Sequence, residues 1–173
     1  LGKIWIGGTM KKHLSRTPPA RYIEMEALKN AHFVMYCASQ FPKVEIDEVS
    51  VTPATDNLYW IDIVLKNDRV YPTISDRSLK LKRIAKDKIS LNSSNNISLV
   101  KIPKGVTKID PFDNTSQGIV ILKKGTEFRL KGKQSLRFRS MVKMDGADGW
   151  VEFKVTSKHG GTIKKRINIK LSE

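Results

Sequence analysis

The spacing of apolar residues changes once along this chain, from a helical period to a period of two, and the change falls at residues 42–43. From Lys43 onward, apolar and polar residues alternate in short segments separated by turn-forming residues. Such alternation places successive side chains on opposite faces of a β-strand. Before Lys43, apolar residues recur at helical spacing. The sequence therefore predicts two parts, residues 1–42 and residues 43–173, with different architectures.

The first part predicts a short strand at residues 3–6 and then one long helix over residues 18–42. Thr17 is suited to cap the helix, and Pro18 and Pro19 to occupy its first positions, where a missing N–H costs nothing. Pro42 ends the pattern, because a proline disfavours helical geometry in the residue before it. The apolar stripe of this helix consists of Ile23, Ala27, Ala31, Val34, Met35 and Ala38. A stripe of this width faces a core, so we expect an interface helix.

The second part predicts a series of strands. They are expected at residues 44–51, 57–66, 77–85, 88–91, 97–102, 118–123, 135–144, 150–157 and 163–171. Residues 145–149 are predicted to form a hairpin turn and residues 159–161 a further turn. Strands at roughly 8–12-residue spacing without helical patterns between them indicate an antiparallel β-sandwich, immunoglobulin- or transthyretin-like. The predicted fold is mostly β, with one strand and one long helix before the sandwich.

Several of these segments also resemble a known enzyme family. The opening LGKIWIGG, the Pro18-Pro19 pair and the helix that ends in ASQFP resemble the end of the catalytic domain of carboxypeptidase A-like zinc metallopeptidases. Residues 43–173, notably VLKNDRVYPT at residues 64–73, are similar to the β-rich C-terminal domain of large bacterial, often secreted members. The resemblance implies that residues 1–42 close a catalytic domain and that residues 43–173 form an accessory sandwich. It also implies an extracellular or periplasmic parent that removes C-terminal residues from peptides with one zinc ion.

The groups that carry this chemistry are expected outside the chain. In the family, a His-x-x-Glu pair, a later His and the general-base Glu precede this segment, and the chain contains none of them by motif. His13, His32 and His159 lie in different predicted elements, so a zinc site built from them is not expected. Cys37 has no nucleophile motif around it and is expected to be a small buried residue. We therefore expect no catalytic residue, metal site or cofactor in this chain, with zinc in the parent catalytic domain.

The chain is strongly basic, with 32 Lys and Arg against 17 Asp and Glu and a net charge of +15. Such a charge could attract acidic partners. The basic residues are, however, spread along the predicted strands, and aromatic residues do not alternate with them as stacking platforms would. We interpret the charge as a solvated, lysine-rich sheet face and expect no nucleic-acid partner. No apolar run approaches the roughly 20 residues of a membrane helix, so we expect no membrane span.

Two functions are consistent with these patterns. The first is structural: the sandwich covers the catalytic domain or shapes access to its cleft, and its partners are the rest of that domain and the peptide substrate of the parent. The alternative is a substrate-binding module for a peptide, glycan or cell-wall polymer. An exposed aromatic cluster that includes Trp60, Tyr71 or Trp150 would favour binding. An even, lysine-covered surface would favour the structural role.

Overall fold

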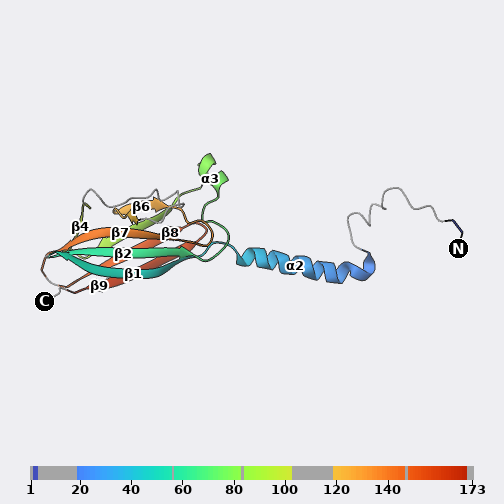
Figure 1. Ribbon diagram of the computed structural model, residues 1–173, viewed down its shortest axis with the longest axis horizontal. Helices are drawn as coiled ribbons and strands as arrows, with labels where there is room; N and C mark the ends of the chain where they lie inside the picture. Colours follow the sequence, from blue (N-terminus) through green and yellow to red (C-terminus); the bar gives the residue numbers. More distant parts are fainter. Residues whose placement is uncertain are drawn as a thin grey trace. The chain divides into compact units, whose positions relative to one another are not determined.

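The computed structural model describes residues 2–3, 19–55, 57–82, 84–102, 119–146 and 148–170. The chain divides into two compact units, Leu1–Ser39 and Gln40–Glu173. This division lies within a few residues of the change in apolar period. The long helix belongs to the first unit, and all strands of the described residues belong to the second (Figure 1).

The first unit contains η1 (Ala20–Tyr22), a 3-10 turn, and α2 (Ile23–Ser39). Pro19 has an extended ψ of 146° and precedes the turn. The prediction that Pro19 occupies one of the first helical positions is therefore wrong. Its carbonyl oxygen accepts a hydrogen bond from the N–H of Tyr22 at 2.8 Å, which closes the turn before the α-helix begins. The predicted helix is otherwise confirmed and ends before Pro42. Thr17, Pro18 and residues 4–6 of the predicted first strand lie outside the described residues.

The larger sheet, sheet A, consists of β1 (Val44–Thr55), β2 (Leu58–Asn67), β7 (Gln134–Met144) and β4 (Ile97–Val100), in that order. Each pairing along this path is antiparallel. A fifth strand, β5 (Ile119–Ile121), pairs in parallel with β7. β1 forms one edge of the sheet and carries Pro53 and two register shifts. Such irregularities discourage pairing with another chain.

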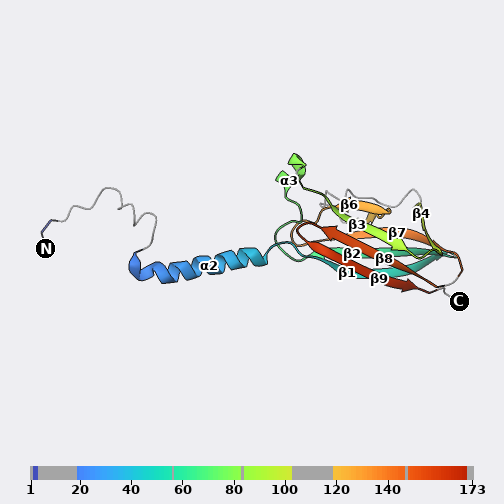
Figure 2. The same cartoon turned by 180° about the vertical axis from the view of Figure 1, so that it is seen from behind.

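The smaller sheet, sheet B, has the order β6 (Gly125–Phe128), β3 (Asp87–Ser93), β8 (Gly149–Ser157) and β9 (Gly161–Ile169). All of its pairings are antiparallel, and Figure 2 shows β8 and β9 side by side. The predicted turn at residues 159–161 joins β8 to β9, and Gly161 adopts a φ of +92° there. This conformation is costly for residues other than glycine. Leu171, the last residue of the predicted final strand, lies outside the described residues.

The core lies between the two sheets and is built from alternate residues of the strands. Its members include Tyr59, Ile61, Ile63 and Leu65 of β2, Leu136, Phe138, Val142 and Met144 of β7, and Val151, Phe153 and Val155 of β8. The rings of Phe128 and Phe138 pack edge to face with centroids 5.5 Å apart, a favourable aromatic geometry. Burial of alternate residues accounts for the period of two in the sequences of these strands. The second unit is an antiparallel β-sandwich, as predicted.

The strand predicted at residues 77–85 is wrong, because this region begins with α3 (Asp76–Leu81). The Oγ atom of Ser75 accepts a hydrogen bond from the N–H of Ser78 at 3.2 Å and so caps the helix. Lys82 ends it in the left-handed conformation, with a φ of 50°. The alternation of Leu79 and Leu81 is typical of a strand, but the cap at Ser75 starts a helix here instead.

The hairpin predicted at residues 145–149 is also wrong. β7 belongs to sheet A and β8 to sheet B, so the connection crosses from one sheet to the other. The N–H groups of Met144 and Asp145 donate to the carbonyl oxygens of Asn57 and Asn96, each at 2.8 Å. These bonds tie the crossing to neighbouring loops. The sequence analysis missed β6, because its four residues contain only one large apolar side chain, Phe128.

Asn67 joins three segments at the end of the sandwich where β1 begins. Its side chain is completely buried. Its Oδ1 atom accepts hydrogen bonds from the N–H groups of Lys43 at 3.3 Å and Arg69 at 3.2 Å. Its Nδ2 atom donates to the carbonyl oxygens of Tyr71 at 2.9 Å and Lys131 at 3.1 Å. Only an amide side chain can accept and donate in this way, so we call this arrangement the Asn67 clamp.

Replacing Asn67 with alanine should lower the free energy of unfolding by about 2–3 kcal/mol, because buried N–H and C=O groups lose their partners. Chemical denaturation of the full chain measures this change. Asn95→Ala, at an exposed loop position, is the matched control and should change the free energy by less than about 0.5 kcal/mol. Equal stabilities of the two variants would show that the clamp is unimportant.

Candidate functional site

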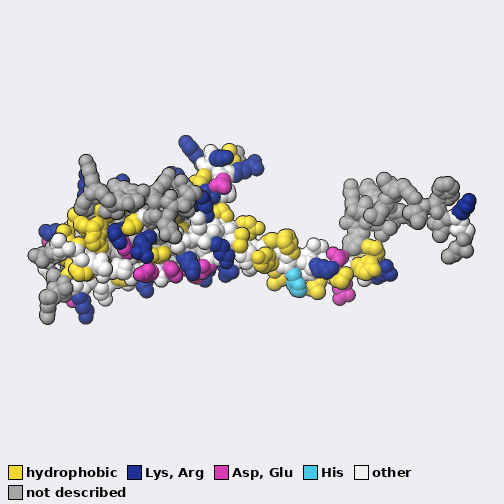
Figure 3. All heavy atoms as spheres, viewed as in Figure 1, with side chains coloured by type: hydrophobic (Ala, Val, Ile, Leu, Met, Phe, Trp, Pro, Cys, Tyr) yellow, Lys and Arg dark blue, Asp and Glu magenta, His cyan; other side chains and the backbone are white. Residues whose placement is uncertain are grey.

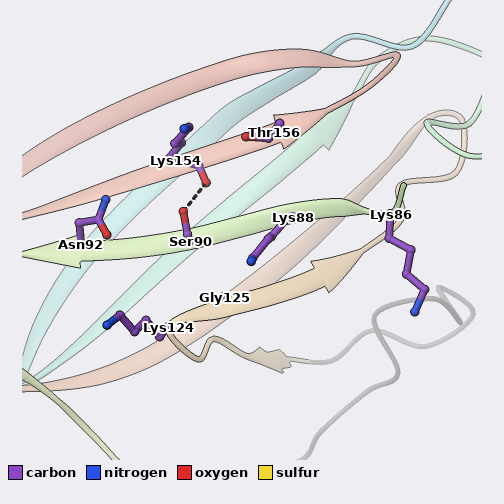
Figure 4. A pocket seen from close by; sticks show the side chains of 8 residues that line it. All are labelled: Lys86, Lys88, Ser90, Asn92, Lys124, Gly125, Lys154 and Thr156. Atoms are coloured by element: carbon purple, nitrogen blue, oxygen red, sulfur yellow. Dashed lines mark hydrogen bonds between the residues drawn. The ribbon is translucent and has the colours of Figure 1, made fainter. Parts of the chain in front are cut away.

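The outer face of sheet B carries a groove lined mainly by lysines. An open depression of about 680 Å³ lies over β3, β6 and β8 (Figure 4). Its lining consists of Lys86, Lys88, Ser90, Asn92, Lys124, Gly125, Lys154 and Thr156, which we call the lysine groove. Ile89, Leu91 and Val155 belong to the core. Because side chains alternate along a strand, the residues between them point outward.

The strand register brings the lining residues together. Lys88 stands opposite Thr156, and Ser90 stands opposite both Lys154 and Gly125. The Oγ atom of Ser90 donates to the carbonyl oxygen of Lys154 at 3.3 Å (Figure 4). Glycine at position 125 leaves room for the lysine on β3, because a Cβ atom there would lie 2.6 Å from Cε of Lys88. The Lys88 side chain therefore extends over β6.

Acids balance only part of the positive charge of this face: Glu127, which stands opposite Lys88, pairs with Lys86, and Glu152 pairs with Arg166. Within the described part of the chain, no carboxylate lies at ion-pair distance from Lys88, Lys124 or Lys154. Lys154 also stands directly opposite Lys164 of β9. Like charges opposite each other on a sheet destabilise it. An anion in the groove would meet ammonium groups that the described residues leave without a carboxylate partner.

A second candidate surface is apolar and lies where the chain enters the second unit. Phe41, Val70 and Tyr71 are 64%, 52% and 42% exposed, and we call them the junction patch. The ring centroids of Phe41 and Tyr71 are 5.8 Å apart. The N–H of Tyr71 donates to the carbonyl oxygen of Gln40 at 3.2 Å, which holds the two aromatic residues together. Exposed apolar clusters of this kind are typical of contact surfaces.

Apolar side chains lie along the visible surface of α2 (Figure 3). None of the helix residues is buried, and large apolar side chains are exposed along its length. Within the predicted stripe, Ile23, Val34 and Met35 are 45%, 64% and 68% exposed. The alanines of the stripe, Ala27, Ala31 and Ala38, are exposed as well. Phe33 and Tyr36 lie outside the stripe and are 65% and 60% exposed. The interface role of the stripe stays a prediction, and the apolar surface is broader than the stripe alone.

The three aromatic residues considered for binding are not brought together. Trp60 lies on the outer face of sheet A, Trp150 on the outer face of sheet B, and Tyr71 in the junction patch. The guanidinium of Arg139 lies 5.4 Å from the ring centroid of Trp60, and that of Arg166 lies 4.2 Å from the ring centroid of Trp150. The three residues therefore offer no shared aromatic platform.

The outer face of sheet A carries a close pair of opposite charges. Arg139 stands opposite Asp62 on the neighbouring strand. Its Nε and Nη2 atoms donate to the two carboxylate oxygens of Asp62, each at 2.6 Å. The hydrogen bonds to Asp62 raise the pKa of Arg139. A bidentate pair of this kind neutralises its own charge, so sheet B is the face that retains charge for a ligand.

The described residues contain no group of three or more His, Cys, Asp or Glu side chains placed to hold a metal ion. His32 lies exposed on α2 and His159 lies exposed in the β8–β9 turn, whereas His13 lies outside the described residues. Cys37 is half-buried on α2, in contrast to the full burial expected for it. No helix among the described residues is long and apolar enough to cross a membrane.

Asp87 is a buried acid that the sequence analysis did not identify. It is 1% exposed, and neither of its carboxylate oxygens has a hydrogen-bond partner among the described residues. Burial raises the pKa of Asp87, and the nearby Thr73 and Ser157 hydroxyls and the charge of His159 oppose this effect. A charged carboxylate in such surroundings destabilises the folded state.

The fold makes the second unit a β-sandwich domain, and comparison with known proteins assigns its family. Residues 43–168 match the model of the family described as "Domain of unknown function (DUF8731)", and the chain belongs to this family. No curated protein matches the sequence. Among solved structures, the chain is similar to the GAE domain of GGA2p from Saccharomyces cerevisiae. That similarity has 11% identity and a TM-score of 0.38, over 75% of this chain and 90% of that one, and carries no functional conclusion.

Asp87→Asn should stabilise the protein at neutral pH by about 1–2 kcal/mol, because it removes a charge whose burial is unfavourable. The raised pKa means that the folded state binds the proton more tightly than the unfolded state. The destabilisation of the wild-type protein by the charged Asp87 carboxylate is therefore absent below 3.8, the ordinary pKa of an aspartate. It develops as the pH rises from that value through the folded-state pKa. Denaturation of both proteins at pH 4 and pH 7 measures this difference. A gain in stability that is the same at both pH values would contradict this prediction.

Proposed function

We propose that the sandwich is a non-catalytic accessory domain of a larger zinc metallocarboxypeptidase-like protein, and that α2 is the last helix of its catalytic domain. The resemblance of residues 1–42 and 43–173 to such proteins supports this proposal. The structural observation that carries it is that α2 exposes large apolar side chains and buries none of its residues. The parent protein would act outside the cytoplasm and remove C-terminal residues from peptides. Its zinc ligands and general base would precede Leu1.

The helix α2 needs a partner for energetic reasons. It has 17 residues, and isolated helices of such length are marginal in water. Burial of one large apolar side chain contributes about 1.5–3 kcal/mol, so covering Phe33, Val34 and Met35 would supply the missing stability. A helix that is apolar around most of its circumference is typical of a position inside a larger protein. In the resembled enzymes, such a helix lies on the catalytic sheet.

The junction patch supports the same proposal. Only Gln40 separates the end of α2 from Phe41, so the junction patch begins two residues after the helix ends. Val70 and Tyr71 extend the exposed apolar surface beside Phe41. Contact at the junction patch would let the sandwich cover the catalytic domain or shape access to its cleft.

A substrate-binding module is the second candidate function. The separate positions of Trp60, Tyr71 and Trp150 give no shared surface on which a neutral ligand could stack. The lysine groove is the observation that favours binding, and its chemistry is that of a receptor for anions. This candidate therefore requires a negatively charged ligand.

A protein that includes the residues before Leu1 should bind one zinc ion and release C-terminal amino acids from peptides. The chain of residues 1–173 should do neither, because zinc requires three or four convergent ligands. Metal analysis and a peptide-hydrolysis assay on both proteins measure this difference. Stoichiometric zinc in residues 1–173, or no zinc in the longer protein, would refute the proposed origin.

The exposed apolar surface of α2 should make the 173-residue chain self-associate. Met35→Asp should weaken this self-association, because a charge would interrupt that surface. In the longer protein, the same change should lower the free energy of unfolding by about 2–5 kcal/mol, as expected for the loss of a buried methionine. Analytical ultracentrifugation and denaturation provide the two measurements. Asn30→Asp, at an exposed polar position of the same helix, is the control. If both variants behave alike, α2 is not an interface.

A further inference from the structure

We propose that the lysine groove binds an anionic polysaccharide, whose carboxylate or sulfate groups contact the ammonium groups of Lys88, Lys124 and Lys154. This inference goes beyond the accessory role proposed above and does not depend on it. Lys88 lies on β3, Lys154 lies on β8, and Lys124 directly precedes β6. All three line one open depression (Figure 4). Residues far apart in the sequence thus form one continuous basic surface.

The acids on this face are already engaged. Glu127 lies 2.8 Å from the Nζ atom of Lys86, and Glu152 lies 3.4 Å from Nη2 of Arg166. Among the described residues, four lysines of the face have no carboxylate partner: Lys88, Lys124, Lys154 and Lys164. The direct opposition of two of these lysines on β8 and β9 is unfavourable in the free protein. A bound polyanion would relieve this repulsion.

The uncharged lining favours a sugar polymer. Ser90, Asn92 and Thr156 supply hydroxyl and amide groups between the lysines. Such groups both donate and accept hydrogen bonds, which matches the hydroxyl groups of a polysaccharide. An extended peptide would commonly bind by adding to a free strand edge. The central strand of the groove, β3, already pairs with β6 and β8, so a peptide could add in the groove only at β6, an edge strand of sheet B, and polyglutamate tests this alternative below.

Other polyanions and membranes fit this face less well. Among the residues that the structure describes, no aromatic residue and no arginine lines the groove, whereas proteins bind single-stranded nucleic acids largely by stacking on such side chains. Trp150 lies on the same face of β8, but the guanidinium of Arg166 lies 4.2 Å from its ring centroid. None of the large exposed apolar side chains of the described residues lies on β3, β6, β8 or β9. The face therefore lacks the apolar anchors of a membrane-binding surface.

The dimensions of the groove suit a polymer. Its volume of about 680 Å³ falls within the range of about 300–1,000 Å³ typical of ligand sites. The depression is open to solvent along the described part of the chain. Alternate residues on a strand lie about 7 Å apart and neighbouring strands about 5 Å apart. The lysines can therefore contact successive charged groups of one chain.

Binding measurements on the full 173-residue chain at about 150 mM salt test the proposal. The probes are polygalacturonate, heparin, polyglutamate, an oligodeoxythymidine and neutral dextran. At least one anionic polysaccharide should bind more tightly than polyglutamate and the oligonucleotide, and dextran should not bind. The affinity should fall as salt rises. Failure of both anionic polysaccharides to bind, or equal affinity for polyglutamate or the oligonucleotide, would overturn the proposal.

Substitutions in the groove test its location. Lys88→Gln together with Lys154→Gln should weaken polysaccharide binding at least tenfold. Lys80→Gln together with Lys101→Gln removes the same charge at exposed positions outside the groove and should change the affinity less than twofold. Equal losses of polysaccharide affinity in the two double variants would show that binding depends on net charge alone, and would overturn the proposed site.

A third variant tests the site without removing a lysine. Thr156→Glu, at an exposed strand position, places a carboxylate in the groove and should also weaken binding at least tenfold. Thermal unfolding of each variant establishes that it is folded. If Thr156→Glu folds and binds like the wild-type protein, the groove is not the site, whatever the lysine variants show.

Discussion

The packing of one apolar face of sheet A against one apolar face of sheet B supplies the stability on which the rest of the structure depends. Phe128, Phe138 and Phe153 are completely buried between the sheets. Alternate residues fill this core, and the residues between them point outward, so the two outer faces can differ in charge. Sheet A joins Asp62 to Arg139 in a close pair, whereas sheet B presents lysines without acidic partners among the described residues. The lysine groove is a consequence of this division between inner and outer faces.

The same division explains why much of the fold could be predicted from the sequence. Burial of one face imposes a period of two, so the inward residues of β2, β7 and β8 were evident before their partners were known. Local capping overrides that period in α3, where Ser75 begins a helix. The connection at residues 145–149 has the composition of a hairpin turn, yet it joins different sheets. Strand pairing between distant segments is not encoded in the alternation of nearby residues.

The candidate surfaces were predictable only in part, for a similar reason. The sequence shows a lysine-rich face, but only the register places Lys154 between Ser90 of β3 and Lys164 of β9. Asn67 stands in a sequence typical of a turn, and Asp87 stands between two lysines. Neither context predicts that the side chain is buried, although both are. Both lie at strand ends, where loops from elsewhere in the chain cover them. The apolar stripe of α2, in contrast, was evident, although Phe33 and Tyr36 widen the exposed surface beyond it.

The Asn67 clamp also determines how the sandwich would carry mechanical load from its N-terminal side. A force transmitted along the backbone through Gln40 first meets the hydrogen bond from the N–H of Tyr71 to the carbonyl oxygen of Gln40. It then meets the bond from Lys43 to Asn67 and the bond of 3.0 Å from the N–H of Val44 to the carbonyl oxygen of Gly160. Asn67 ends a strand of sheet A, whereas Gly160 lies in the turn between two strands of sheet B. A load applied at the start of β1 is therefore shared by both sheets.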